Sequence, residues 1–317
     1  MMQNLEKRNG RTIDAILITG PTASGKSALA LDLARRHGGV VVNADSMQVY
    51  DILQVLTARP SLEDMEGIDH RLYGHVPPQA AYSTGDWLRE AVALLACLEK
   101  EGRLPVFVGG TGLYFKALTG GLAEMPAVPA PVRERLRARL AEEGAPALHA
   151  ELAEKDPQGA ALLKLNDGQR IVRALEIIAV SGRSIQDWQA AGGPIAIAPD
   201  KALKIVVQPD RALLAERIDR RFATMFEAGA VEEVEALLAL RLPPAMPAMK
   251  AIGVPQIAAM LEGDMTPAQV IETSAAATRQ YAKRQMTWFR NQLDESWIRL
   301  DPADGAAKDV IGATSAL

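Results

Sequence analysis

The chain has 317 residues, enough for about two domains of ordinary size. Apolar residues make up 48% and charged residues 23%, close to the globular average, which excludes wholesale disorder and fibrous repeats. With 35 basic and 39 acidic residues the net charge is −4, so only the location of basic side chains could argue for a nucleic-acid partner.

The single cysteine, Cys97, excludes an internal disulfide and a multi-cysteine zinc site, and it indicates a reducing compartment. Cys97 lies in a helical apolar pattern, so we expect it in the core. No apolar run approaches the roughly 20 residues of a membrane span, and the first residues lack the apolar stretch of a signal peptide. We therefore expect a cytoplasmic protein that does not enter a membrane.

Buried strands and amphipathic helices alternate in the first third of the chain. Residues 12–19, 40–42 and 105–108 read as strands, residues 27–37 and 88–98 as helices, and a further strand follows at 203–207. This alternation predicts an α/β fold with a doubly wound parallel sheet. Ligands bind beyond the carboxyl ends of such strands, which directs attention to residues 20–27, 43–48 and 109–114.

The pattern changes after Pro126, Pro129 and Pro131, and residues 132–193 contain only helical segments. We predict an α/β core formed by residues 1–122 and 200–317, interrupted by an all-helical insertion over 123–199. Two long helices, at 212–240 and 268–289, follow the last predicted strand.

A phosphate-binding loop follows the first strand. The run Gly20-Pro21-Thr22-Ala23-Ser24-Gly25-Lys26-Ser27 matches G-x-x-x-x-G-K-[ST] between a strand and a helix. Glycines let backbone N–H groups curl around a phosphate, the lysine adds a point charge, and the serine hydroxyl suits Mg²⁺. The alternative is a chance match in a tight turn. The motif predicts phosphate binding without identifying which phosphate.

Polar side chains follow the next two strands. Asp45 could ligate a metal or accept a proton from a nucleophile, or it could simply cap a helix. Thr111, in Gly109-Gly110-Thr111-Gly112, offers a hydroxyl beside the phosphate loop, although the sequence alone slightly favours a helix cap over a catalytic role.

The segment 278–290 carries four basic residues, no acidic residue, and the aromatic side chains Tyr281, Trp288 and Phe289. Arg279, Lys283 and Arg290 fall near one helical face, which suits phosphates and stacked bases. The alternative is a solvated helix whose aromatic side chains face the core. Weaker basic stretches lie around Arg133, at Gln169 to Arg173, and at Arg217, Arg220 and Arg221.

Together these segments resemble the tRNA dimethylallyltransferase family, over roughly residues 14 to 291. The resemblance rests on GPTASGKS (20–27), NADSMQVY (43–50), TARPS (57–61), YSTGDW (82–87), VGGTGLYFKAL (108–118), NDGQRIVRALEI (166–177) and TRQYAKRQMTWFR (278–290). Gly112 stands where a bulkier residue is common in the family.

The resemblance implies a P-loop kinase-like core and transfer of a dimethylallyl group from dimethylallyl diphosphate to N6 of the adenosine 3′-adjacent to the tRNA anticodon. It implies that Asp45 is the general base and that Thr111 lies near the reacting centre. Mg²⁺ would bind at Ser27, and the diphosphate would be held by residues 20–27 with Arg217 and Arg221. The implied tRNA contacts are Asp45, Ser46, Met47, Gln48, Thr111, Arg133, Gln169, Arg170, Ile171, Val172, Arg173, Lys283, Arg284, Gln285, Thr287, Trp288 and Arg290.

Two other functions fit the phosphate loop. An ATP-dependent small-molecule phosphotransferase would use the same fold, and a regulatory nucleotide-binding module would bind without catalysis. The first leaves the basic and aromatic segment 278–290 without a task, and the second leaves Asp45 and Thr111 without one. We therefore favour prenyl transfer to tRNA, by a protein expected to be a monomer.

Overall fold

A six-stranded, entirely parallel sheet forms the centre of the computed structural model, which describes residues 13–302. The strand order is β3-β2-β4-β1-β5-β6. The strands are β1 (Ala15–Thr19), β2 (Val40–Asn43), β3 (His70–Arg71), β4 (Pro105–Gly109), β5 (Ala202–Val207) and β6 (Ile298–Leu300). The predicted parallel α/β fold is confirmed, with two short edge strands that the sequence pattern did not indicate.

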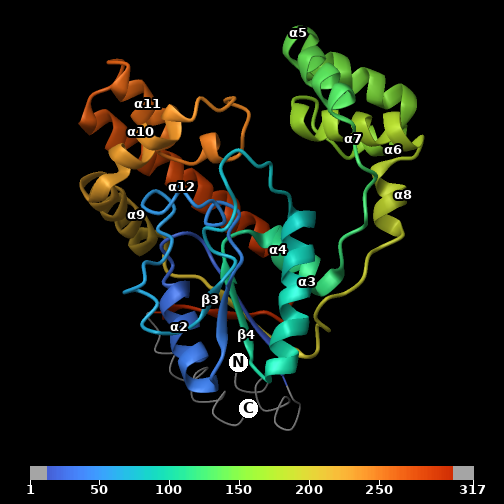
Figure 1. The fold of residues 1–317 in the computed structure, drawn as a ribbon. Helices are drawn as coiled ribbons and strands as arrows, with labels where there is room; N and C mark the ends of the chain where they lie inside the picture. The colour runs from blue at the N-terminus through green and yellow to red at the C-terminus, as the bar shows by residue number, and fades with distance from the viewer. Residues whose placement is uncertain (1–12, 303–317) are drawn as a thin grey trace. The chain divides into compact units, whose positions relative to one another are not determined.

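Helices cover both faces of the sheet (Figure 1). Helix α2 (Lys26–His37) packs Leu29 and Leu33 against alternate strand residues such as Ile16 and Ile18, and it ends at Gly38 in the left-handed conformation. On the opposite face, Trp87 of α3 (Thr84–Glu101) stacks on a ring of α4 (Gly112–Gly120) and meets the sheet. Burying both faces explains why the strands read as continuous apolar runs.

Residues Gly120–Ala196 form a separate compact unit made only of helices. Its helices are α5 (Ala130–Lys155), α6 (Pro157–Ala161), α7 (Gly168–Ser181) and α8 (Ile185–Ala190). A small apolar core, including Leu148, Leu152 and Ile171, holds the unit together. Helix α5 is kinked at Gly144, whose φ of 80° is not helical. The other unit comprises Met1–Thr119 and Ile197–Leu317.

The chain after β5 is helical, but the predicted helix over 212–240 is broken. It forms α9 (Arg211–Met225), a π-helical turn η1 (Phe226–Ala230) and α10 (Val231–Ala239). The break falls at Gly229, whose φ is 104°, a conformation that glycine adopts at little cost. The short helices η2 (Ala248–Lys250) and α11 (Val254–Leu261) follow.

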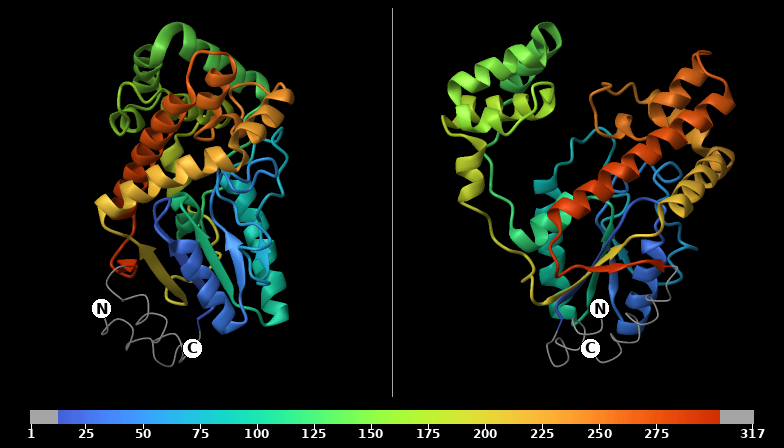
Figure 2. Two further views of the ribbon diagram at one scale, coloured as in Figure 1. Left: turned by 90° about the vertical axis from the view of Figure 1, so that its left-hand side faces the viewer. Right: turned by 180° about the vertical axis from the view of Figure 1, so that it is seen from behind.

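The last helix, α12 (Pro267–Gln292), confirms the second predicted long helix. It packs beside α9 and crosses the core unit at the end where the phosphate loop lies (Figure 2). Thr266 and Gln269 form a capping box at its start.

The structure also bears on the expected burial of Cys97 and on the search for membrane-spanning helices. Cys97 is exposed, so its placement in the core was wrong; it lies on the solvent side of α3, whose buried residues are Trp87, Ala91 and Leu98. None of the helices in the described residues is both long and apolar enough to cross a membrane.

Gly109, the last residue of β4, lies very close to the chain that follows β2, and it gives a test of the fold. A Cβ at this position would lie 2.0 Å from the carbonyl oxygen of Ala44. We expect Gly109→Ala to lower the free energy of unfolding by about 1–3 kcal/mol, because backbone must move to accept the methyl group. Urea denaturation would measure this against Gly120→Ala, whose added Cβ meets nothing within 4 Å. Equal stability of the two variants would contradict the close approach.

Candidate functional site

The phosphate loop between β1 and α2 presents its backbone outward. Ala23 and Gly25 have positive φ angles of 62° and 90°, and the Ser24 N–H donates back to the Pro21 carbonyl. No side chain caps the start of α2. Its first N–H groups are therefore left for an anion, at the end of the helix where the dipole is positive. The Ser24 hydroxyl, buried in this loop, has no hydrogen-bond partner among the described residues.

The loop after β2 positions Asp45. The Asn43 side chain accepts from the Asp45 N–H at 2.8 Å and donates to the Asp45 carbonyl at 3.0 Å. One carboxylate oxygen, Oδ1, accepts from the Met47 N–H at 2.9 Å. Asp45 therefore closes a turn rather than capping a helix, and Oδ2 has no hydrogen-bond partner in the described part of the chain.

The loop after β4 is tied to the Asp45 loop by Thr111. Its hydroxyl accepts from the Ser46 N–H at 2.9 Å and donates to the Ser46 hydroxyl at 3.3 Å. Helix α4 begins at the next residue, so Thr111 has the cap position while its hydroxyl bridges the two loops. The hydroxyl thus contacts the loop of Asp45, and its predicted role at the reacting centre stays a prediction.

Gln285 on α12 connects the loop after β4 to the phosphate loop. Its Oε1 accepts from the Thr22 N–H at 3.1 Å, and its Nε2 donates to the Gly110 carbonyl at 2.9 Å. The side chain is buried. Both ends of this predicted tRNA contact are therefore occupied by the protein itself.

A cavity of about 370 Å³, which we call the phosphate-loop cavity, lies where these loops meet. Residues 22–27 line it together with Asp45, Gln48, Arg217 and Arg221. The sequence predicted each of these residues, and the fold brings them together from three separate segments: the phosphate loop, the loop after β2 and helix α9. Three cationic side chains and one carboxylate thus surround a space suited to a phosphorylated ligand.

Burial shifts the charges in this cavity. It lowers the pKa of Lys26 to about 8, while Asp45 opposes the shift and Arg221 adds to it. Burial likewise lowers the pKa of Arg221, whose guanidinium donates to the Thr22 hydroxyl at 3.4 Å. Folding therefore disfavours the charged forms of both side chains, and a bound anion would offset that cost.

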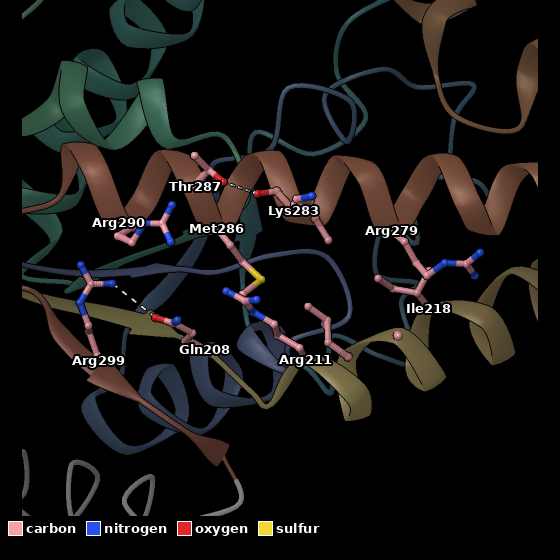
Figure 3. Close-up of a pocket in the computed structure, with 12 residues that line it drawn as sticks. Gln208, Arg211, Ile218, Arg279, Lys283, Met286, Thr287, Arg290 and Arg299 are labelled. Carbon is pink, nitrogen blue, oxygen red and sulfur yellow. Dashed lines mark hydrogen bonds between the residues drawn. The ribbon is translucent and has the colours of Figure 1, made fainter.

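The remaining predicted contacts on α12 lie on two other surfaces. Lys283, Thr287 and Arg290 line a cavity of about 620 Å³ between α9 and α12, which we call the basic pocket (Figure 3). Arg284 and Trp288 line a shallower hollow. Gly112 makes room for Trp288, because a Cβ there would lie 2.3 Å from the indole ring.

In the helical unit, some of the predicted tRNA-contact residues are buried and others are exposed. Ile171 and Val172 are buried in its core, so their side chains pack the unit and are not available to RNA. Gln169 and Arg170 are exposed. Arg133 and Arg173 lie 3.9 Å and 3.2 Å from the carboxylate of the buried Glu176, which the sequence reading did not connect to them.

Several residues near the phosphate-loop cavity were not predicted. The lining includes Tyr73, and burial together with the Asp45 charge raises the pKa of both Tyr73 and Tyr281. The carbonyls of Thr57 and Ala58 accept from the Gln48 amide at 2.9 Å and 3.0 Å. TARPS, one of the segments of the resemblance, begins at Thr57 and was the signal that could have led to this loop.

Glu233 of α10 holds the chain that leads into that loop. Its carboxylate accepts from three successive N–H groups, those of Gln54 at 2.7 Å, Val55 at 2.6 Å and Leu56 at 3.0 Å. On the other side, Gly253 leaves space for Leu56, since a Cβ there would lie 2.5 Å from its side chain. No sequence pattern connects Glu233 to residues some 180 positions away.

No group of three or more His, Cys, Asp or Glu side chains among residues 13–302 could hold a metal ion. The side-chain oxygen atoms of the phosphate-loop cavity include the Ser27 hydroxyl and the Asp45 carboxylate, and its lining has no histidine or cysteine. Oxygen donors of this kind suit Mg²⁺, which keeps several waters and is shared with a phosphate ligand, better than they suit zinc.

The lowered pKa of Lys26 predicts how anion binding depends on pH. We expect affinity for inorganic diphosphate to fall as the pH rises through about 8, because a neutral amine loses its attraction for the anion. Calorimetric titration between pH 7 and 10 would measure this. Lys26→Met should bind diphosphate about 10- to 100-fold more weakly at pH 7. Because this variant lacks the amine, its affinity should change with pH only through the protonation of diphosphate itself. The same pH profile in both proteins would contradict the prediction.

Glu233 gives a second test. We expect Glu233→Gln to speed hydrogen exchange at the amides of residues 54–56, because a glutamine side chain offers one acceptor oxygen where the carboxylate offers two. Mass spectrometry of exchanged peptides would measure it. Glu235→Gln is the matched control, since this exposed residue makes no ion pair or side-chain hydrogen bond within the described chain. Unchanged exchange in Glu233→Gln would exclude the anchoring role.

Comparison with known proteins gives the family of the chain. The family model described as IPP transferase matches residues 48–292, and that described as isopentenyl transferase matches residues 13–75. The chain is 69% identical over 304 residues to a tRNA dimethylallyltransferase of Rhizobium meliloti, covering 96% of this chain and 99% of the relative. It is 65% identical over 302 residues to one of Agrobacterium fabrum, covering 95% and 100%.

Solved structures of related enzymes indicate the same family. The full-length tRNA isopentenylpyrophosphate transferase of Bacillus halodurans is 32% identical, with a TM-score of 0.67 and coverage of 96% of this chain and 97% of that one. A eukaryotic dimethylallyltransferase acting on tRNA is 26% identical, with a TM-score of 0.79 and coverage of 94% and 77%. The phosphate-loop cavity therefore lies in an enzyme, and the chain belongs to the IPP transferase family.

Proposed function

We propose that this enzyme transfers a dimethylallyl group from dimethylallyl diphosphate to N6 of the adenosine 3′-adjacent to the anticodon of tRNA, releasing diphosphate. The observation that carries the proposal is the phosphate-loop cavity, where a phosphate loop and the carboxylate of Asp45 face one space. A phosphate loop alone suits many reactions. The carboxylate beside it and the family membership together favour prenyl transfer.

The diphosphate would bind in the loop of residues 20–27, to the uncapped backbone N–H groups at the start of α2 and to the Lys26 side chain, and also to Arg217 and Arg221. As the carbon–oxygen bond breaks, negative charge builds on the leaving diphosphate. Preorganised N–H groups and cations stabilise such charge in the transition state more than in the ground state. The Ser24 hydroxyl, which has no partner within residues 13–302, is a further donor for the same anion.

Mg²⁺ is part of the proposal. Ser27 would hold it beside the diphosphate, since its hydroxyl lies at the start of α2 in the cavity lining. When bound, the ion would supply further positive charge to the leaving group.

Asp45 would accept the proton that N6 loses as the new carbon–nitrogen bond forms. Its Oδ1 is held by the Met47 N–H, which fixes the carboxylate, and Oδ2 is left for the amine. Thr111 would act at the same centre through the loop that it ties to Ser46. The adenine must leave its stack to reach the cavity, which bases of single-stranded loops do at small cost.

The RNA contacts that remain consistent with exposure are Ser46, Met47, Gln48, Gln169, Arg170, Lys283, Arg284, Thr287, Trp288 and Arg290. Arg133 and Arg173 would join them by exchanging Glu176 for an RNA phosphate. We assign Gln285, Ile171 and Val172 to support of these contacts, because their side chains are buried.

A label-transfer assay would test the function. Protein, Mg²⁺, labelled dimethylallyl diphosphate and unmodified tRNA are incubated, and label on the RNA is counted. We expect transfer by the unchanged protein and a loss of about 10²- to 10⁴-fold in kcat for Asp45→Asn, because its amide cannot take the proton. Asp51→Asn is the matched control, since Asp51 is exposed and its carboxylate has no partner among residues 13–302.

A parallel reaction with ATP separates the alternatives. Absence of label on the RNA, with phosphate moved from ATP to a small acceptor, would overturn prenyl transfer in favour of phosphotransfer. Equal rates for Asp45→Asn and Asp51→Asn would leave transfer in place but remove Asp45 as the base.

A further inference from the structure

The basic pocket holds more positive charge than the protein neutralises. Five cationic side chains and no acidic side chain line it, drawn from α9, α12 and β6 (Figure 3): Arg211, Arg279, Lys283, Arg290 and Arg299. Arg279 pairs with Asp219, and Arg299 donates to the Gln208 side chain at 3.3 Å. Arg211, Lys283 and Arg290 have no salt bridge within the described chain. Like charges gathered in one hollow repel one another, and an anion would remove that repulsion.

The floor of the basic pocket is apolar. Leu214, Ile218 and Ala282 are buried there and form one small cluster, against which Met286 packs. An inorganic anion or an RNA phosphate needs the cations but gains nothing from this floor. A ligand that joins a charged group to an apolar group would use both.

The pocket has the size of a small-molecule site and is separate from the phosphate-loop cavity. Its volume is about 620 Å³, within the range of about 300–1,000 Å³ for ligand pockets. The linings of the two cavities share no residue. Ala23 of the phosphate loop packs against the apolar cluster of Leu214 and Ile218, while Arg217 and Arg221 of the same helix line the other cavity.

We propose that the basic pocket is a second binding site, which takes a phosphorylated small molecule with an apolar part. The phosphate groups would lie among the five cations and the apolar part on Leu214, Ile218 and Met286. A prenyl diphosphate longer than the five-carbon donor and a nucleotide share this chemistry. The pocket shares Lys283, Thr287 and Arg290 with the RNA contacts proposed above, but it uses no residue of the phosphate-loop cavity, so binding there can be tested separately from the transfer reaction.

Calorimetric titration with geranyl diphosphate and, separately, with ATP would test the site. Lys26→Ala protein is used so that binding at the phosphate loop is weakened. We expect at least one probe to bind this variant at one site per chain, and the probe that binds identifies the source of the ligand. Loss of all binding of both probes in Lys26→Ala would overturn the proposal.

Further variants locate the site, in the same Lys26→Ala background. Arg211→Gln and Arg299→Gln should each weaken binding about tenfold, because each removes a charged contact to phosphate. Arg220→Gln is the matched control on α9, since Arg220 pairs with Glu216 and does not line the pocket. Ala215→Trp should abolish binding by filling the space above the floor. Thermal unfolding confirms that each variant is folded.

RNA is the alternative occupant, and the same variants exclude or establish it. If Arg211→Gln and Arg299→Gln weaken tRNA binding by the otherwise unchanged protein while neither small probe binds, the pocket contacts RNA phosphates and the proposal is wrong. If tRNA affinity is unchanged and probe binding falls, the small-molecule site is supported.

Discussion

Two hydrogen bonds of the Gln285 side chain set the spacing between the phosphate loop and the loop after β4. One amide group accepts from Thr22 and donates to Gly110, so it joins two loops that lie 263 and 175 residues away from it in the chain. A carboxylate in its place would bring two acceptors and face the Gly110 carbonyl without a proton, while an apolar side chain would leave both backbone groups unsatisfied. From Gly110 the connection continues through Thr111 to Ser46, beside Asp45. The carboxylate therefore has a defined position relative to the phosphate loop without touching it.

The charged groups buried in the phosphate-loop cavity lower the stability of the unliganded protein. Lys26 and Arg221 are charged groups that burial disfavours, and only one carboxylate, that of Asp45, lowers the cost. A stronger set of acidic neighbours would stabilise the empty protein but would compete with an anionic ligand. One carboxylate among three cations leaves a net positive site, which favours a diphosphate and keeps a base nearby. Local rules for stability are commonly broken in this way at functional sites.

The sequence predicted the parts whose signals are local. The parallel sheet follows from apolar runs that alternate with helices, and residues 20–27, Asp45 and Thr111 lie at strand ends, where such a sheet gathers ligands. The strands β3 and β6 are two and three residues long, too short for a periodic pattern. The break at Gly229 was missed because a single glycine within an apolar helical pattern is often tolerated. Glu233 and the Glu176 partner of Arg133 act across long sequence distances, and no local pattern carries that information.

The same sequence distances explain why the tRNA contacts were predicted only in part. A motif groups residues that are consecutive, whereas a helix distributes them around its axis. Within 278–290, Tyr281 and Gln285 lie toward the loops, and Lys283 and Arg290 line the basic pocket. The run 169–173 divides in the same way, with Gln169 and Arg170 exposed and Ile171 and Val172 in the core. Burial therefore separates the residues of a motif that contact a ligand from those that position them.

The net charge of −4 conceals how the charges are distributed. Acidic residues on the surface form ion pairs with nearby basic residues, as Asp32 does with Arg36 and Glu143 with Arg139. Asp45 is the only acidic residue in the linings of the phosphate-loop cavity and the basic pocket, while α9 and α12 supply six of their eight cations between them. The potential that an approaching anion meets is set by charges within about 10 Å, because salt screens the rest. An acidic protein can therefore present two positive cavities, and its isoelectric point says little about the ligands that it binds.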